Sequence, residues 1–121
     1  MHYVCLIYGD PKVVFNNSPE SNALLDAVGP HNAELKQNGT LVSGQPLSLP
    51  SEAVTVRVQN GTMSTTDGPF METREVLGGF CVIDARDMND ALRIAAAMPH
   101  AKLGCIEVRP MIDFSKPRPI L

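Results

Sequence analysis

The sequence predicts an α+β domain in which two helices cover one face of an antiparallel sheet. The patterns of strand and helix follow one another in the order strand, helix, strand, hairpin, strand, helix, strand. No glycine-rich nucleotide-binding motif of a parallel doubly wound sheet occurs among them. A split βαβ arrangement would place the first strand between the last strand and the strand that contains Cys81.

Length and composition are those of one domain over residues 1–121. A chain of this size buries roughly 65 % of its unfolded surface, so it can fold without a metal or a disulfide. A hydrophobic fraction of 44 % against 19 % charged residues argues against a disordered chain. A net charge of −3 without a basic run argues against nucleic acid as a partner. No apolar stretch approaches the ~20 residues that span a bilayer, and the N-terminus lacks the pattern of a signal peptide, so we expect no membrane partner and a cytoplasmic protein.

The strands are indicated by β-forming residues and by turn signals between them. The alternation of valine with polar residues makes residues 53–59 the clearest strand, and Asn60-Gly61 predicts a hairpin turn after it. Residues 12–17 are expected to form a loop, and residues 70–76 carry no clear pattern. The other predicted strands cover residues 2–8, part of 40–49, 62–66, 79–84 and 104–108.

Two helices are predicted from capping residues and apolar spacing. Ser18 begins the first helix, which ends near Asn38, and Asp87 begins the second, over residues 88–98. The apolar stripe of the first helix includes His31, so this histidine should face the sheet. Gly29-Pro30 predicts a kink or two abutting helices, because proline removes one backbone hydrogen bond.

The predicted sheet has a second face that no segment of the chain covers. Exposed valine-rich strands would be unfavourable in water, so we expect a second copy of the chain to bury them in a homodimer.

Three cysteines, Cys5, Cys81 and Cys105, each lie in an apolar strand pattern. Their odd number and the absence of a CxxC pair predict buried, reduced thiols and no metal site. A thiol cluster on three neighbouring strands is the alternative.

Residues 65–80, TTDGPFMETREVLGGF, carry a specific signature. This block resembles the DGPF-domain proteins of the YCII-related family, and the resemblance extends to residues 1–10, 82–84 and 104–110. It implies a ferredoxin-like split βαβ fold with an inserted β-hairpin, paired as a dimeric α/β-barrel type of homodimer. It also implies a cleft in which a histidine and an aspartate act as acid and base in some members, whereas related domains fused to sigma-type transcription factors suggest an interaction role.

His31 and Asp67 are the candidate catalytic residues. The resemblance matches His31 to the acid–base histidine, and imidazole exchanges protons near neutral pH. Asp67, at the start of the DGPF turn, would orient His31 or act as a base. The structural alternatives are a half-buried histidine bonded to the backbone and an aspartate that only begins a turn.

Three further residues are candidates for substrate binding. Arg74 can hold an anionic group in its forked guanidinium, although charged runs more often form solvated faces. Ser43 and Gln45 can line the same cleft with hydrogen-bonding groups. Glu107 and Arg109 alternate with apolar residues on the last strand and are interpreted as a structural pair.

Two functions remain open at this point. The first is a dimeric protein that binds or transforms a small organic molecule by His/Asp acid–base chemistry, with no cofactor and no metal. The second is a non-enzymatic interaction module, linked to transcriptional regulation, that uses the dimer or the proline-rich tail at residues 115–121 to bind a protein partner.

Overall fold

A four-stranded antiparallel sheet with strand order β2-β5-β1-β6 forms the centre of the chain, in a computed structural model that describes residues 1–121. The first strand therefore lies between the last strand and the strand of Cys81, which confirms the predicted split βαβ order. A separate two-stranded sheet, β3-β4, is the predicted hairpin, inserted between β2 and β5. The strands are β1 (His2–Gly9), β2 (Leu41–Pro46), β3 (Val54–Gln59), β4 (Thr62–Asp67), β5 (Val76–Asp84) and β6 (Gly104–Pro110).

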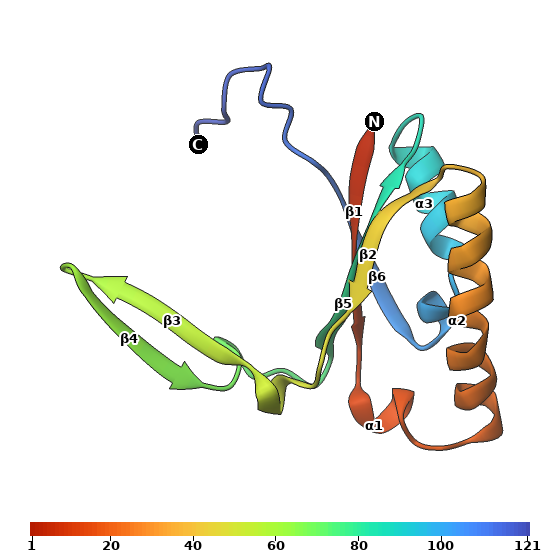
Figure 1. Cartoon of the computed structure of the whole chain (residues 1–121), viewed down its shortest axis with the longest axis horizontal. Coiled ribbons are helices and arrows are strands. Elements are labelled where there is room, and N and C mark those ends of the chain that lie inside the picture. Colours follow the sequence, from red (N-terminus) through yellow and green to blue (C-terminus); the bar gives the residue numbers. More distant parts are fainter.

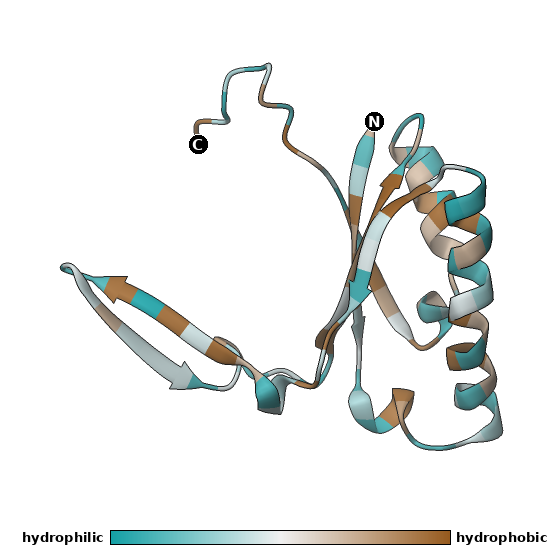
Figure 2. Ribbon diagram, viewed as in Figure 1, coloured by the Kyte–Doolittle hydropathy of each residue, from teal (hydrophilic) through white to brown (hydrophobic).

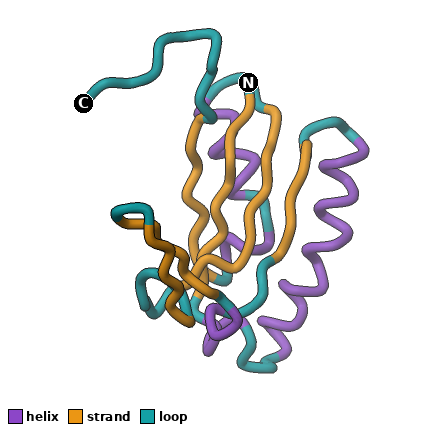
Figure 3. The backbone as a smooth tube through the Cα atoms, turned by 60° about the vertical axis from the view of Figure 1, so that its left-hand side comes forward, coloured by secondary structure: helices purple, strands orange, loops and turns teal.

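Both long helices cover the same face of the four-stranded sheet (Figures 1 and 3). Ser18 and Asp87 cap them as predicted, since the Oγ of Ser18 accepts from Ser21 N at 3.1 Å and Asp87 Oδ1 accepts from Asp90 N at 2.8 Å. No helix is both long and apolar enough to cross a membrane. The helices are α1 (Pro11–Val14), α2 (Pro19–Gln37) and α3 (Met88–Ala96), with short 3₁₀ turns η1 (Pro50–Glu52) and η2 (Pro99–Lys102).

The helical regions depart from prediction at two places. The predicted loop at 12–17 includes the end of the short helix α1. Asp10 caps the start of this helix, where its carboxylate accepts a hydrogen bond from Lys12 N. Of the two expectations at Gly29-Pro30, the one of two abutting helices is wrong, because α2 continues through Pro30 without a break. Pro30 and Asp26, four residues before it, are both exposed, so the carbonyl that loses its helical hydrogen bond faces water.

The hydrophobic core lies between the sheet and α3 and leaves α2 almost uninvolved. Its nine members come from β1, β5 and the region of α3, and the one buried residue of α2 is Ser21. The helix α2 therefore covers the sheet without packing tightly against it. The core residues are Tyr3, Cys5, Cys81, Ile83, Ala85, Ala91, Ile94, Ala95 and Met98.

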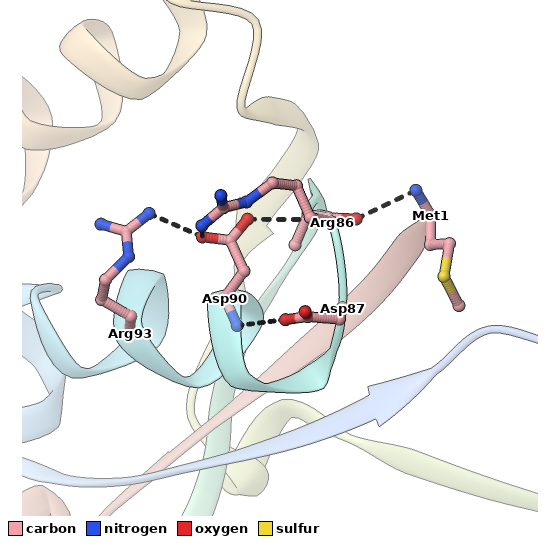
Figure 4. A network of polar contacts seen from close by, with 6 residues as sticks. Met1, Arg86, Asp87, Asp90 and Arg93 are labelled. Atoms are coloured by element: carbon pink, nitrogen blue, oxygen red, sulfur yellow. Dashed lines mark hydrogen bonds and ion pairs between the residues drawn. The ribbon is translucent and has the colours of Figure 1, made fainter.

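A polar network fixes the beginning of α3 (Figure 4). The carboxylate of Asp90 accepts the backbone N–H of Arg86 at 3.0 Å and the guanidinium of Arg93 at 2.7 Å, although only 8 % of Asp90 is exposed. These hydrogen bonds, led by that of the Arg86 backbone, hold the pKa of Asp90 well below its usual range. Met1 joins the neighbouring loop, since its amine donates to the Ala85 carbonyl at 3.0 Å.

The hairpin β3-β4, called the arm below, projects away from the side of the sheet that the helices cover (Figure 1). Val54, Val56 and Val58 lie on one of its faces and are 57 to 66 % exposed. Apolar residues alternate with polar ones along β3 in Figure 2. The C-terminal tail beyond β6 leaves on the same side and also exposes apolar residues, among them Phe114 and Ile120. The chain thus presents two apolar segments that it does not bury itself.

Candidate functional site: a cavity beside two histidines

A cavity of about 470 Å³ lies where α2 stands off the sheet. Its walls come from the ends of β1 and β5, from β2 and the segment after it, and from α1, α2 and η2. Most of the lining is apolar, and none of the lining residues is Asp, Glu, Lys or Arg. The polar side chains on the wall are Tyr8, Asn32, Gln45, Ser48, Cys81 and His100. A molecule held here would meet an uncharged, mostly apolar surface with a few hydrogen-bonding groups.

His100 is the ionisable base on this wall. It follows Pro99 in η2, the turn that packs against α2, and it is half-buried. Burial lowers the pKa of His100 below its ordinary value, and the nearby charge of His31 lowers it further. The imidazole of His100 is therefore held in its neutral form at physiological pH, in which one ring nitrogen accepts and the other donates a proton.

His31 faces the sheet side of α2, as the apolar spacing predicted, and lies near His100. It is half-buried and is not one of the cavity-lining residues, although its helical neighbours Val28 and Asn32 are. His31 therefore lies next to the cavity wall without being part of it.

Each of these two rings leaves one buried nitrogen without a hydrogen-bond partner. The atoms are His31 Nε2 and His100 Nδ1, and no other buried side-chain nitrogen or oxygen in the chain lacks a partner. Buried polar atoms are nearly always paired, because an unpaired one costs about 1–3 kcal/mol. Two neighbouring imidazoles with unpaired nitrogens, one of them from a residue on a cavity wall, are therefore a candidate site.

The structure does not bring Asp67 to His31 within one chain. Asp67 ends β4 in the arm, whereas His31 lies on α2, on the other side of the sheet (Figure 1). The hydrogen bonds of the DGPF turn are made by its neighbours: Gly68 N donates to Ala53 O at 2.7 Å, and Thr55 Oγ1 donates to Gly68 O at 2.9 Å. Gly68 has a positive φ of 95°, which explains the glycine of this turn.

The predicted substrate-binding residues are separated. Gln45 lines the cavity. Ser43 is exposed, does not line the cavity and pairs with Val82 on β5. Arg74 lies in the loop after the arm, where its largely exposed guanidinium is 4.0 Å from Glu75 Oε1. Only Gln45 of these three therefore lies at the cavity.

The other face of the sheet carries the remaining polar candidates. Glu107 and Arg109 form an ion pair on exposed positions of β6, as the structural interpretation expected. Cys105 shares their face and is exposed, with its thiol 3.8 Å from Glu75 Oε2, so the prediction that all three cysteines are buried is wrong for Cys105. Cys5 and Cys81 are buried on the helix-covered face, so no cluster of three thiols forms. No group of three or more His, Cys, Asp or Glu side chains is placed to hold a metal ion.

Sequence reasoning missed His100. The residue follows the proline that ends the second predicted helix, where a histidine has no periodicity to mark it. Its importance comes from the packing of η2 against α2, a contact between segments far apart in the sequence.

Comparison with known proteins agrees with this architecture. The model of the YCII-related domain matches residues 1–115. The chain belongs to the YCII-related family. An uncharacterized protein of Rhizobium meliloti (strain 1021), R00369, is 33 % identical to this YCII-related chain over 117 residues, with 92 % of each chain covered.

A solved structure shows the same fold. It is 5-chloro-2-hydroxyhydroquinone dehydrochlorinase (TftG) from Burkholderia phenoliruptrix AC1100, in complex with 2,5-dihydroxybenzoquinone. The likeness covers 93 % of this chain and 94 % of that one, with a TM-score of 0.50 and 16 % sequence identity. It confirms the ferredoxin-like α+β fold of this YCII-related protein.

Proposed function

We propose that this YCII-related protein binds and transforms a small, uncharged organic molecule in the cavity between the sheet and α2. The observation that carries this proposal is the combination of a wall without any charged residue and two neighbouring imidazoles with unpaired buried nitrogens. A charged ligand would lose its hydration without gaining an opposite charge, which disfavours it strongly. A neutral molecule with one or two hydroxyl or carbonyl groups loses little and can pair with the imidazole.

The two histidines have different roles in this proposal. His100 lines the cavity, so it is the candidate catalytic residue that accepts a proton from the ligand or donates one to it. Its lowered pKa favours the neutral ring, which can accept the proton of a weakly acidic hydroxyl. His31 acts on the ligand through His100 and is a positioning residue.

A ring compound that carries hydroxyl groups is the first ligand class to test. The fold is shared with a dehydrochlorinase in complex with 2,5-dihydroxybenzoquinone, which supports a hydroxylated ring. The absence of charge is argued from the cavity wall of this chain alone, because the hydroxyl groups of that quinone are acidic. Hydroquinone is an uncharged probe of this class at neutral pH, and benzoate is a ring of similar size that carries a negative charge.

We propose in addition that the chain works as a homodimer. The sheet face opposite the helices has no cover within the chain, and the apolar side of the arm and the tail both extend on that side (Figures 1 and 2). Asp67 pairs with Val54 across the arm and so shares its apolar face. In a dimer that buries this face, Asp67 would lie at the interface between the two copies.

A thermal-shift titration tests the proposed ligand class. We expect hydroquinone to raise the melting temperature of the protein in a saturable way and benzoate to leave it unchanged. We expect His100→Leu to remove the shift while retaining the fold, and His2→Leu, at the exposed start of β1, to keep it. Equal shifts with both rings, or an undiminished shift in His100→Leu, would rule out the proposed site.

The alternative function is a non-enzymatic interaction module. The observation that favours it is the tail, in which Phe114 is 91 % exposed and Ile120 93 % exposed. Removal of residues 114–121 tests the tail separately from the cavity, because the cavity has no wall from this segment. If the shortened protein still binds the ligand but no longer associates with a protein partner, the tail serves only as a surface for that partner.

A further inference from the structure

Two buried thiols face each other across the middle of the sheet. Cys5 on β1 and Cys81 on β5 are direct partners in the antiparallel register, away from the irregularity at Ile7/Tyr8. Both lie on the helix-covered face, with Cys5 fully buried and Cys81 7 % exposed. Cys81 lines the cavity, whereas Cys5 does not.

The spacing of this pair suits a disulfide. Directly opposed residues of antiparallel strands have Cα atoms about 4.5–5.5 Å apart, within the roughly 4.4–6.8 Å range of disulfides. The register also places both side chains on the same face of the sheet, so the two sulfurs lie on neighbouring strands with no residue between them.

We propose that Cys5 and Cys81 form a redox-active pair, which a small uncharged hydroperoxide that enters the cavity oxidises to a disulfide. The cavity supplies the access, because Cys81 is on its wall and the wall has no charge to exclude a neutral oxidant. No other pair of cysteines can form within the chain, because Cys105 lies on the opposite face of the sheet.

The chemistry takes two steps and consumes one hydroperoxide. The sulfur of Cys81 attacks an oxygen of the peroxide, the O–O bond breaks, and the thiol proton of Cys81 leaves with the released alcohol or water. Cys81 is then a sulfenic acid. The sulfur of Cys5 attacks the sulfur of Cys81, the S–S bond forms, the S–O bond breaks, and the hydroxyl leaves as water with the proton of Cys5. Two electrons pass from the two thiols to the peroxide.

Oxidation changes the wall of the proposed ligand site. The Cys81 sulfur turns toward Cys5 and loses its proton, so the cavity loses a weak donor. On the other side of Cys81, the Cβ position of Gly44 would lie 2.9 Å from the Cβ of Cys81, which leaves the residue little room to move toward β2. The disulfide also closes a loop that includes most of the chain, and it should raise the melting temperature.

Peroxide titration with thiol mapping tests the pair. The reduced protein is treated with hydrogen peroxide, quenched with catalase, unfolded and alkylated, and its peptides are identified by mass spectrometry. We expect Cys5 and Cys81 to appear as one cross-linked peptide, Cys105 to be alkylated, and dithiothreitol to restore three alkylated cysteines. Oxidation of Cys105 with Cys5 and Cys81 still alkylated would overturn the proposal.

Two variants provide controls. Cys105→Ser should form the cross-link as the parent does, because that thiol lies outside the pair. Cys81→Ala should leave Cys5 reduced at the same peroxide dose. A disulfide between Cys5 and Cys105 in this variant would contradict the assignment.

If Cys81→Ala does not fold, labelling of the native parent tests whether a reagent can reach Cys81 through the cavity. The neutral reagent methyl methanethiosulfonate should modify Cys81, whereas a dianionic aromatic disulfide should modify only Cys105. Modification of neither buried thiol by the neutral reagent would overturn the proposed entry through the cavity.

Discussion

His100 on η2 lies beside His31 on α2, close enough for the charge of one imidazole to lower the pKa of the other. Both rings keep one buried nitrogen unpaired, and only His100 reaches the cavity wall. A histidine pair kept without partners costs stability, so its presence next to an otherwise apolar cavity points to a function for His100, which lines that cavity.

Replacement of His31 by leucine tests this cost. Leucine completes the apolar stripe of α2 and removes an unpaired buried nitrogen, so we expect the free energy of unfolding to hold or to rise by about 1 kcal/mol. Thermal unfolding at neutral pH measures the change. A loss of roughly 2 kcal/mol or more would mean that His31 is a satisfied structural residue.

Stability should fall as the pH drops through the range in which free histidine titrates. The pKa of His100 is lowered in the folded state, so the unfolded chain binds its proton first, and stability present above about pH 6.5 declines below it. Denaturant unfolding between neutral and mildly acidic pH measures this slope. We expect His100→Leu to flatten it, and an unchanged slope in that variant would contradict the burial of a neutral ring.

The network at the start of α3 predicts a separate acid transition. The pKa of Asp90 is depressed, so its contribution is fully present above the unfolded value of about 3.9 and disappears as the pH falls further. Asp90→Asn should lower the melting temperature at pH 7, and its difference from the parent should shrink under acid conditions. Asp113→Asn, in the exposed tail, is the control with little effect at any pH. A constant Asp90→Asn difference down to strongly acidic pH would disprove this assignment.

The apolar face of the arm predicts a dissociable homodimer. Val56→Lys places a charge in the middle of the exposed valines and should weaken association at least tenfold, about 1.4 kcal/mol. Ser64→Lys adds the same charge to the opposite face of the arm, because Ser64 pairs with Arg57, and should leave association unchanged. Sedimentation velocity distinguishes the two. If both variants sediment like the parent protein, or if the parent itself is a monomer, the arm is not the dimer interface.

Local signals were sufficient to predict most of the fold. Ser18 and Asp87 mark helix starts through bonds to nearby backbone, and Asn60-Gly61 marks a hairpin that needs only its own strands. The strand order followed from the alternation of these segments. Pro30 does not divide α2 into two helices, because its missing hydrogen bond lies on the exposed side of α2, which the local sequence does not reveal.

The candidate site was predictable only in part. The apolar stripe of α2 placed His31 toward the sheet, and the bend of β2 indicated Gln45, which lines the cavity. His100 could not be found this way, because its role comes from a contact between η2 and α2. Asp67, the partner predicted for His31, lies on the inserted arm. No residue pattern specifies where this arm is placed relative to the sheet.

The most direct test of the account follows the imidazole resonances of the three histidines by NMR during a titration with hydroquinone. We expect the signals of His100 to shift first and saturably, those of His31 to follow, and those of His2, on the exposed start of β1, to stay in place. Benzoate should move none of them. Shifts confined to His2, or equal shifts with benzoate, would contradict a neutral-ligand site beside the histidine pair.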